Sequence, residues 1–248
     1  AGSALRSGRR GRRFESCQLD QFPSRLRAAF LRPENLNPGK QAAPRELFYW
    51  KKGPDPGRMG ASITIMSILS DRLSEEILQA RQRVYTVGEP TPLQRLNLPG
   101  IKAPVYAKRE DLGPIRAYKW RGAFNCMAAL SQEARDKGIV AASAGNHAQG
   151  VALAARVLNC HATIFMPRST PEVKQTEVRR HGGRHVKIML HGDCYDETAA
   201  AAHEYTETHG CTFVHPYDDL VTMAGQGTLA DEVVMSGEGP FDRAYVAI

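Results

Sequence analysis

The sequence lacks the residue patterns of several protein classes. No apolar run approaches the ~20 residues that a membrane-spanning helix needs, so an integral membrane protein is not expected. The five cysteines are an odd number and include no CxxC pair. This usage disfavours disulfide and zinc frameworks and favours a reducing compartment, which we take to be the cytoplasm. The eight histidines show no metal-ligand spacing beside a carboxylate, so no metal is expected.

The basic charge is confined to one end of the chain. The formal net charge is +7. Residues 1–60 hold 13 Lys or Arg against 5 Asp or Glu, whereas the remaining residues hold 20 against 21. The body of the protein is therefore near neutral, and neither nucleic acid nor a membrane is expected as its partner. Anion or nucleic-acid binding through the basic end alone is a separate alternative.

Residues 1–65 differ in pattern from the rest of the chain. An Arg-rich cluster covers 9–13, and prolines and glycines recur between 33 and 57. We interpret the segment as a disordered basic leader. Two alternatives are an organelle-targeting leader and a non-native extension upstream of Met66, and we favour the extension over targeting.

Beyond residue 66, short apolar segments alternate with helical patterns. This alternation predicts an α/β fold with a mostly parallel sheet and helices on both faces. Ligands bind such folds at the carboxyl ends of the strands. The predicted helices cover 71–86, 119–137, 146–158, 171–181, 193–209 and 219–236, and the predicted strands cover 105–111, 139–142, 162–166, 185–190, 211–214 and 242–248.

The segment 117–123 places Lys119 at the start of a predicted helix. A helix start does not favour a lysine charge, so a lysine there needs a reason. Tyr118 precedes it and offers a ring that can lie against a flat cofactor. A buried lysine beside another cation can lose its proton and become a nucleophile, and Arg116 and Arg121 are near in sequence. The pattern indicates Schiff-base chemistry.

The segment 143–150 is a turn that opens the next predicted helix. Its small residues let backbone amides approach an anion, and the side chains of Ser143 and Asn146 add polar contacts. His147 in such a place is more often structural than catalytic. Together with Lys119, the turn predicts a site for a substrate that carries a carboxylate.

Four separated motifs resemble, in order and spacing, those of threonine dehydratases. These enzymes belong to the fold type II (tryptophan-synthase-β-like) family, which uses pyridoxal 5′-phosphate (PLP). The resemblance covers about residues 66–248 and implies two three-layer αβα units with mostly parallel sheets. It divides the chain into 66–140, the first part of a large PLP domain; 141–219, a small domain; and 220–248, the return to the large domain. The motifs are 108–111, 117–123, 143–150 and 224–228.

The resemblance also implies a role for each site residue. Lys119 would bond to PLP and later remove the substrate Cα proton, Asn146 would hydrogen-bond the PLP O3′, and Tyr118 would pack on the ring. The reaction would be loss of water from L-threonine to give 2-oxobutanoate and ammonia in isoleucine biosynthesis, by a homo-oligomer. The residues expected to hold the substrate carboxylate are Ser143, Ala144, Gly145, Asn146 and His147.

The end of the chain departs from the resemblance. In threonine dehydratases the strand matching 245–248 continues into a glycine-rich loop that holds the PLP phosphate. We therefore expect an incomplete large domain, an uncovered face on the helix 219–236 and an inactive fragment. The alternatives are a serine dehydratase or racemase-type PLP enzyme and a non-catalytic remnant that acts by association. The choice between threonine and serine stays open.

Overall fold

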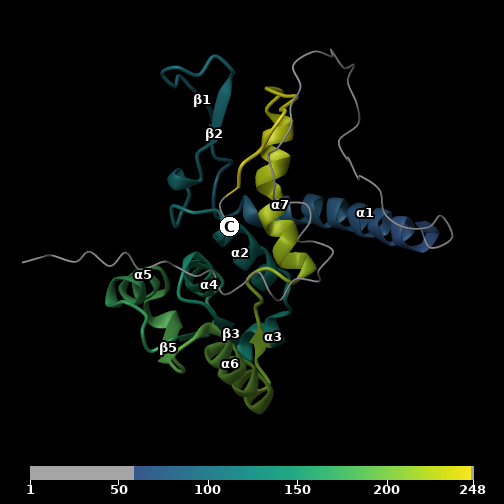
Figure 1. Cartoon of the computed structure of the whole chain (residues 1–248). Coiled ribbons are helices and arrows are strands. Elements are labelled where there is room, and N and C mark those ends of the chain that lie inside the picture. Colours follow the sequence, from purple (N-terminus) through teal and green to yellow (C-terminus); the bar gives the residue numbers. More distant parts are fainter. Residues whose placement is uncertain (1–58, 247–248) are drawn as a thin grey trace, which may run out of the picture. The chain divides into compact units, whose positions relative to one another are not determined.

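The computed structural model describes the backbone of residues 59–246 and the side chains of 71–246 (Figure 1). Every element below lies in one compact unit, 55–248. The first helix, α1 (Met59–Val84), begins well before the predicted start at residue 71 and takes in 59–65. The rest of the predicted basic leader lies outside the described residues.

A four-stranded parallel sheet forms the centre of the second half of the chain. Its strand order is β5-β4-β3-β6, and all three pairings are parallel. The predicted strands at 139–142 and 162–166 are confirmed to the residue, which follows from their short and mostly apolar character. The strands are β3 (Ile139–Ala142), β4 (Ala162–Met166), β5 (Val186–Leu190) and β6 (Thr212–Phe213).

Helices cover both faces of this sheet. Along β3, Ile139 and Ala141 pack into one apolar cluster with the helix that follows, whereas Val140 and Ala142 pack into a second cluster with Ala202. Successive side chains of a strand point to opposite faces, so the two clusters mark two layers of helices. The predicted α/β fold class is therefore confirmed. The covering helices are α4 (Asn146–Val157) and α5 (Glu172–Gly182) on one face and α6 (Tyr195–His209) on the other.

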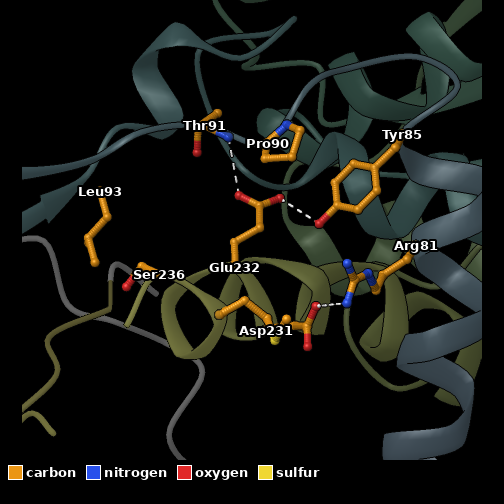
Figure 2. Close-up of a pocket in the computed structure, with 9 residues that line it drawn as sticks. Arg81, Tyr85, Pro90, Thr91, Leu93, Asp231, Glu232 and Ser236 are labelled. Carbon is orange, nitrogen blue, oxygen red and sulfur yellow. Dashed lines mark hydrogen bonds and ion pairs between the residues drawn. The ribbon is translucent and has the colours of Figure 1, made fainter. Parts of the chain in front are cut away.

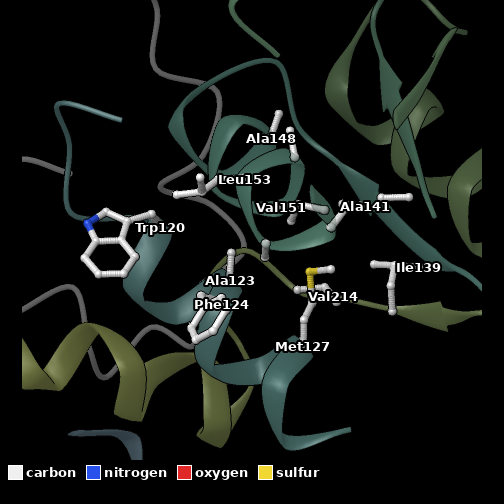
Figure 3. Packing of buried hydrophobic residues seen from close by; sticks show 14 of the residues in the cluster. Trp120, Ala123, Phe124, Met127, Ile139, Ala141, Ala148, Val151, Leu153 and Val214 are labelled. Carbon is white, nitrogen blue, oxygen red and sulfur yellow. The ribbon is translucent and has the colours of Figure 1, made fainter. Parts of the chain in front are cut away.

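Three other helices pack against α2 (Trp120–Ala129). This helix contacts α4 on one side and α7 (Leu220–Met235) on another, and α1 lies against α7. Figure 3 shows side chains of α2, α4 and β3 meeting in one apolar cluster. A second sheet pairs β1 (Leu93–Leu96) with β2 (Val105–Lys108) in antiparallel fashion. Within the described residues the second sheet is this antiparallel pair, whereas the resemblance implied a mostly parallel sheet.

Three sequence predictions need correction. The predicted helix 119–137 is two helices, α2 and α3 (Gln132–Asp136), because Leu130 is extended and the Ser131 hydroxyl accepts from the Ala134 N–H at 3.2 Å to cap α3. The predicted strand 105–111 ends at Lys108 and passes into the 3₁₀ helix η3 (Glu110–Leu112). The described part of the predicted strand 242–248 is not a strand, since no described strand pairs with it.

A buried ionic cluster joins these elements. Arg121 of α2 is fully buried and donates to both carboxylate oxygens of Glu110, at 3.0 and 2.9 Å. It also donates to Glu232 of α7 and to the Thr228 hydroxyl at 3.0 Å. Burial opposes the charge on Glu232, but hydrogen bonds from Arg121 and Lys108 outweigh it and lower the pKa of this carboxyl. The side chains of the cluster therefore stay charged, and their ion pairs hold α2, α7 and η3 together.

Glu232 also links α7 to the segment that follows α1. Its oxygens accept from the Tyr85 hydroxyl at 2.9 Å and from the Thr91 N–H at 3.2 Å. Figure 2 shows Glu232 between these two groups, in the wall of a pocket of about 230 Å³. Burial raises the pKa of Tyr85 to about 12, and the hydrogen bond to Glu232 adds to the rise. Tyr85 therefore stays a neutral donor at physiological pH.

We expect Arg121→Met to cost about 3–5 kcal/mol of unfolding free energy, because it leaves the buried carboxylates of Glu110 and Glu232 with only Lys108 of the two cations that pair with them. The matched control is Arg81→Met, which removes a half-exposed ion pair with Asp231 on the same helix α7 (2.9 Å). That change should cost about 0–1 kcal/mol. Urea unfolding followed by circular dichroism measures both losses, and equal losses would contradict the assigned importance of the Arg121 cluster.

Candidate functional site

Lys119 lies at the N-terminus of α2, as predicted. It is the residue before Trp120, and its side chain is half-buried. Its Nζ donates to the Pro216 carbonyl at 3.4 Å, and Nζ lies 5.9 Å from the centre of the Tyr118 ring. The backbone carbonyl of Lys119 accepts from Gln226 Nε2 of α7 at 3.3 Å. The lysine is therefore held at both its main chain and its amine.

Burial lowers the pKa of the Lys119 amine below its usual value. The direction agrees with the sequence argument, but of the two causes named there, burial and a neighbouring cation, only burial contributes. Arg121 is paired with carboxylates on the other side of its helix, and Arg116 is exposed. Desolvation of the ammonium, rather than a neighbouring cation, produces the shift.

The 143–150 turn connects the end of β3 to the start of α4. Ser143 continues the ladder, since its N–H donates to the Phe165 carbonyl at 3.0 Å, and its hydroxyl accepts from the Gly145 N–H at 3.3 Å. Ala144 is partly buried against the core. Asn146, the first residue of α4, is exposed. This junction lies at the carboxyl end of a parallel strand, where such folds bind ligands.

The start of α4 has the donors for an anion. The first recorded hydrogen bond there runs from the Gln149 N–H to the Gly145 carbonyl, at 3.3 Å, so the N–H groups of 146–148 precede it. A helix N-terminus carries partial positive charge and attracts anions. A Cβ added at Gly145 would meet nothing within 4 Å, so open space lies beside these donors.

Gly150 brings the lysine and the turn together. A Cβ at this position would lie 2.9 Å from the Trp120 Cα and 3.2 Å from the Lys119 carbonyl oxygen. Only a hydrogen fits there, so the first turns of α4 lie directly against the start of α2. His147 is close enough for the Lys119 charge to lower its pKa. The structure thus places two of the predicted site segments side by side.

Sequence reasoning missed three contacts of this site. They are the Pro216 carbonyl on the Lys119 amine, Gln226 on the Lys119 carbonyl, and the His147 ring on the Val214 carbonyl at 3.0 Å. Gln226 lies within the 224–228 motif, which was a usable signal. The Pro216 carbonyl, 97 residues after Lys119, left no signal in the sequence, because any residue carries a backbone carbonyl.

Two absences hold for the described part of the chain. No three His, Cys, Asp or Glu side chains gather there in a group that could hold a metal ion. None of its helices combines the length and apolar character needed to cross a membrane. Its four cysteines are free thiols: Cys126, Cys160, Cys194 and Cys211.

Comparison with known proteins defines the class. A family model described as "Pyridoxal-phosphate dependent enzyme" matches residues 84–248. The chain belongs to this family, and the resemblance inferred from four motifs is confirmed at that level.

Particular relatives are dehydratases and racemases. The chain is 46% identical over 175 residues to the L-threonine dehydratase biosynthetic IlvA of Mycobacterium tuberculosis, covering 70% of this chain and 41% of that protein. The processed threonine deaminase isoform 2 of Solanum lycopersicum is 38% identical with a TM-score of 0.60, covering 68% of this chain and 47% of that one. Maize serine racemase is 30% identical with a TM-score of 0.60, covering 66% and 49%. The chain spans less than half the length of these relatives.

The residues of the site fit the family's cofactor. PLP has an aldehyde that bonds to a primary amine and carries anionic oxygens. Lys119 supplies a half-buried amine, and burial lowers its pKa, which makes loss of its proton easier than for an exposed lysine. The free N–H groups of 146–148 suit an anionic group of a ligand. These two groups belong to segments that Gly150 holds in contact.

We expect Gly150→Ala to destabilise the protein by about 1–3 kcal/mol, because the methyl group forces α4 away from α2. Gly145→Ala, five residues earlier in the same motif, is the matched control. Its added methyl group meets nothing within 4 Å, so its cost should stay smaller, within about 1 kcal/mol. Thermal or urea unfolding compares the two variants, and the packing argument fails if they lose the same stability.

Proposed function

We propose that this polypeptide carries part of the machinery for PLP-dependent loss of water from L-threonine, which yields 2-oxobutanoate and ammonia in isoleucine biosynthesis. The observation that carries the proposal is the half-buried amine of Lys119, a residue whose backbone lies directly against Gly150 of α4. Relatives named L-threonine dehydratase, at 46% and 42% identity, support the choice of substrate.

Lys119 is proposed as the residue that bonds to the cofactor and moves the substrate proton. Its uncharged amine is a nucleophile, and the same Nζ, once released, accepts the Cα proton of the substrate. Bound PLP supplies an electron sink for the carbon that loses this proton. The chain's own contribution is to hold Nζ in place, through the Pro216 contact, and to keep it partly out of water.

The 143–150 turn is proposed to hold the substrate carboxylate. The N–H groups at the start of α4 donate to it, and Ser143 adds a hydroxyl. Asn146, exposed at the first position of α4, is available to a polar atom on the cofactor ring, and Tyr118 lies beside the lysine that would carry that ring.

Serine chemistry is the second candidate, because maize serine racemase is among the structural relatives. Racemisation needs a proton donor on the second face of the substrate carbon. Ala144 has a methyl group, which cannot transfer a proton. The side chain at this position therefore favours elimination over racemisation.

The division of the chain into domains is part of the proposal. The parallel sheet and its helices fall almost wholly within 141–219, the proposed small domain. Helices α1, α2 and α7 belong to 66–140 and 220–248, the proposed parts of the large domain. Lys119 then lies where the two regions meet, since α2 contacts both α4 and α7.

The test is covalent capture of the cofactor. We expect PLP followed by borohydride to add one pyridoxyl group to Lys119, detected by peptide mass spectrometry, and we expect Lys119→Ala to lose both this adduct and the absorbance of the bound cofactor. Lys137→Ala, which removes an exposed lysine paired with Glu133, should lose neither. An adduct spread evenly over the surface lysines would end the assignment.

Turnover is measured separately. Wild-type chain with PLP is given L-threonine or L-serine, and ammonia and the 2-oxoacid are quantified. Release of 2-oxobutanoate that Lys119→Ala abolishes supports the activity. Capture of PLP at Lys119 with no turnover of either amino acid would limit this polypeptide to cofactor binding.

A further inference from the structure

The His147 side chain is buried in the first turn of α4, with 3% of its surface exposed. Its Nε2 lies 3.0 Å from the Val214 carbonyl oxygen. A carbonyl oxygen only accepts, so Nε2 must carry the hydrogen. This contact joins the start of α4 to the residue that follows β6.

The other ring nitrogen is then an unprotonated acceptor. Burial lowers the pKa of His147 to about 4, against a smaller opposing effect of the Val214 hydrogen bond, so the ring is neutral at physiological pH. With the hydrogen on Nε2, Nδ1 carries a lone pair. Nδ1 is buried and has no hydrogen-bond partner among the described residues.

Val214 leads directly to the group that contacts the lysine. Its side chain is fully buried, and its N–H donates to the Val140 carbonyl at 2.8 Å, which fixes it to the sheet. Two residues later, the Pro216 carbonyl accepts from Lys119 Nζ at 3.4 Å. His147 thus holds one end of a short segment, 214–216, whose other end lies against the amine.

We propose that His147 is a positioning residue: by donating from Nε2 to the Val214 carbonyl, it holds 214–216 over Lys119 and keeps the lysine amine half-buried. Its neutral ring does this without placing a second positive charge beside the amine. The proposal deepens the proposed function, because it rests on Lys119 being the cofactor lysine. It concerns the cofactor-free protein, so it can be tested without turnover.

Two amide substitutions separate the roles of the ring nitrogens. In His147→Gln the side-chain N–H reaches about as far as Nε2 and can still donate to Val214. In His147→Asn the amide reaches only about as far as Nδ1, so the Val214 contact is lost. If position 147 required only a polar side chain, both variants would behave alike.

The readout is the pH profile of Lys119 labelling by a trace of acetic anhydride, in the absence of PLP, with exposed Lys174 as the internal reference. The titratable groups recorded around Lys119 are Tyr118 at 5.9 Å, His147, and His215, which interacts with His147. We expect the Lys119 midpoint to rise by about half a pH unit in His147→Asn, a roughly threefold drop in uncharged amine at a given pH. His147→Gln should keep the wild-type midpoint.

His181→Asn controls for loss of a buried histidine, since His181 is 5% exposed on α5 and is not among the groups that contact Lys119. A shift in His147→Asn alone supports the proposal. No shift in that variant, or an equal shift in His147→Gln or His181→Asn, overturns it.

If His147→Asn does not fold, ¹⁵N NMR of histidine-labelled wild-type protein decides. The proposal requires a neutral His147 ring with its proton on Nε2 from about pH 5 to 8. A proton on Nδ1, or a charged ring above about pH 6, overturns it. Failure of PLP capture at Lys119 would end the proposed function without changing either readout.

Discussion

The constraint on which the rest of the structure depends is the charge of Arg121 in a place without water. A buried guanidinium is tolerated only when carboxylates and other acceptors surround it. Glu110, Glu232 and Thr228 meet that need, and they come from a 3₁₀ turn and from α7. Because Arg121 is the second residue of α2, satisfying it fixes where that helix begins. The position of Lys119, two residues earlier, follows from it.

Close contacts at glycines fix how near α2 lies to its two neighbouring helices. On the α7 side, a Cβ at Gly225 would lie 2.6 Å from the Gly122 Cα; on the α4 side, a Cβ at Gly150 would lie 2.9 Å from the Trp120 Cα. Helices that touch through hydrogens cannot slide or rotate without a clash. The ionic cluster therefore sets the start of α2, and the glycines set its distance from both neighbours, which places the Lys119 backbone against the first turns of α4.

The sequence predicted what local pattern controls. The strands at 139–142 and 162–166 were found to the residue, because strands covered on both faces are mostly apolar, and Thr163 is the one polar residue of these two. The break at Leu130 was missed although its signal is local, since Ser131 caps the next helix, whereas the pairing of β1 with β2 depends on contacts between separate segments. In the site, the motifs located Lys119 and the turn. Arg121 was misjudged as a neighbour of the amine, because closeness along the chain does not show that its partners lie 11 and 111 residues away.

The charges at the site then follow from burial. Lys119 and His147 are both bases in partly or wholly dry surroundings, and each pKa is lowered mainly by desolvation. Burial lowers the pKa of His147, the more deeply buried of the two, and the charge of Lys119 lowers this pKa further. A neutral imidazole can donate to Val214 without repelling the ammonium beside it. Of the two bases, the imidazole is therefore the neutral donor, and the lysine is the one that carries the positive charge.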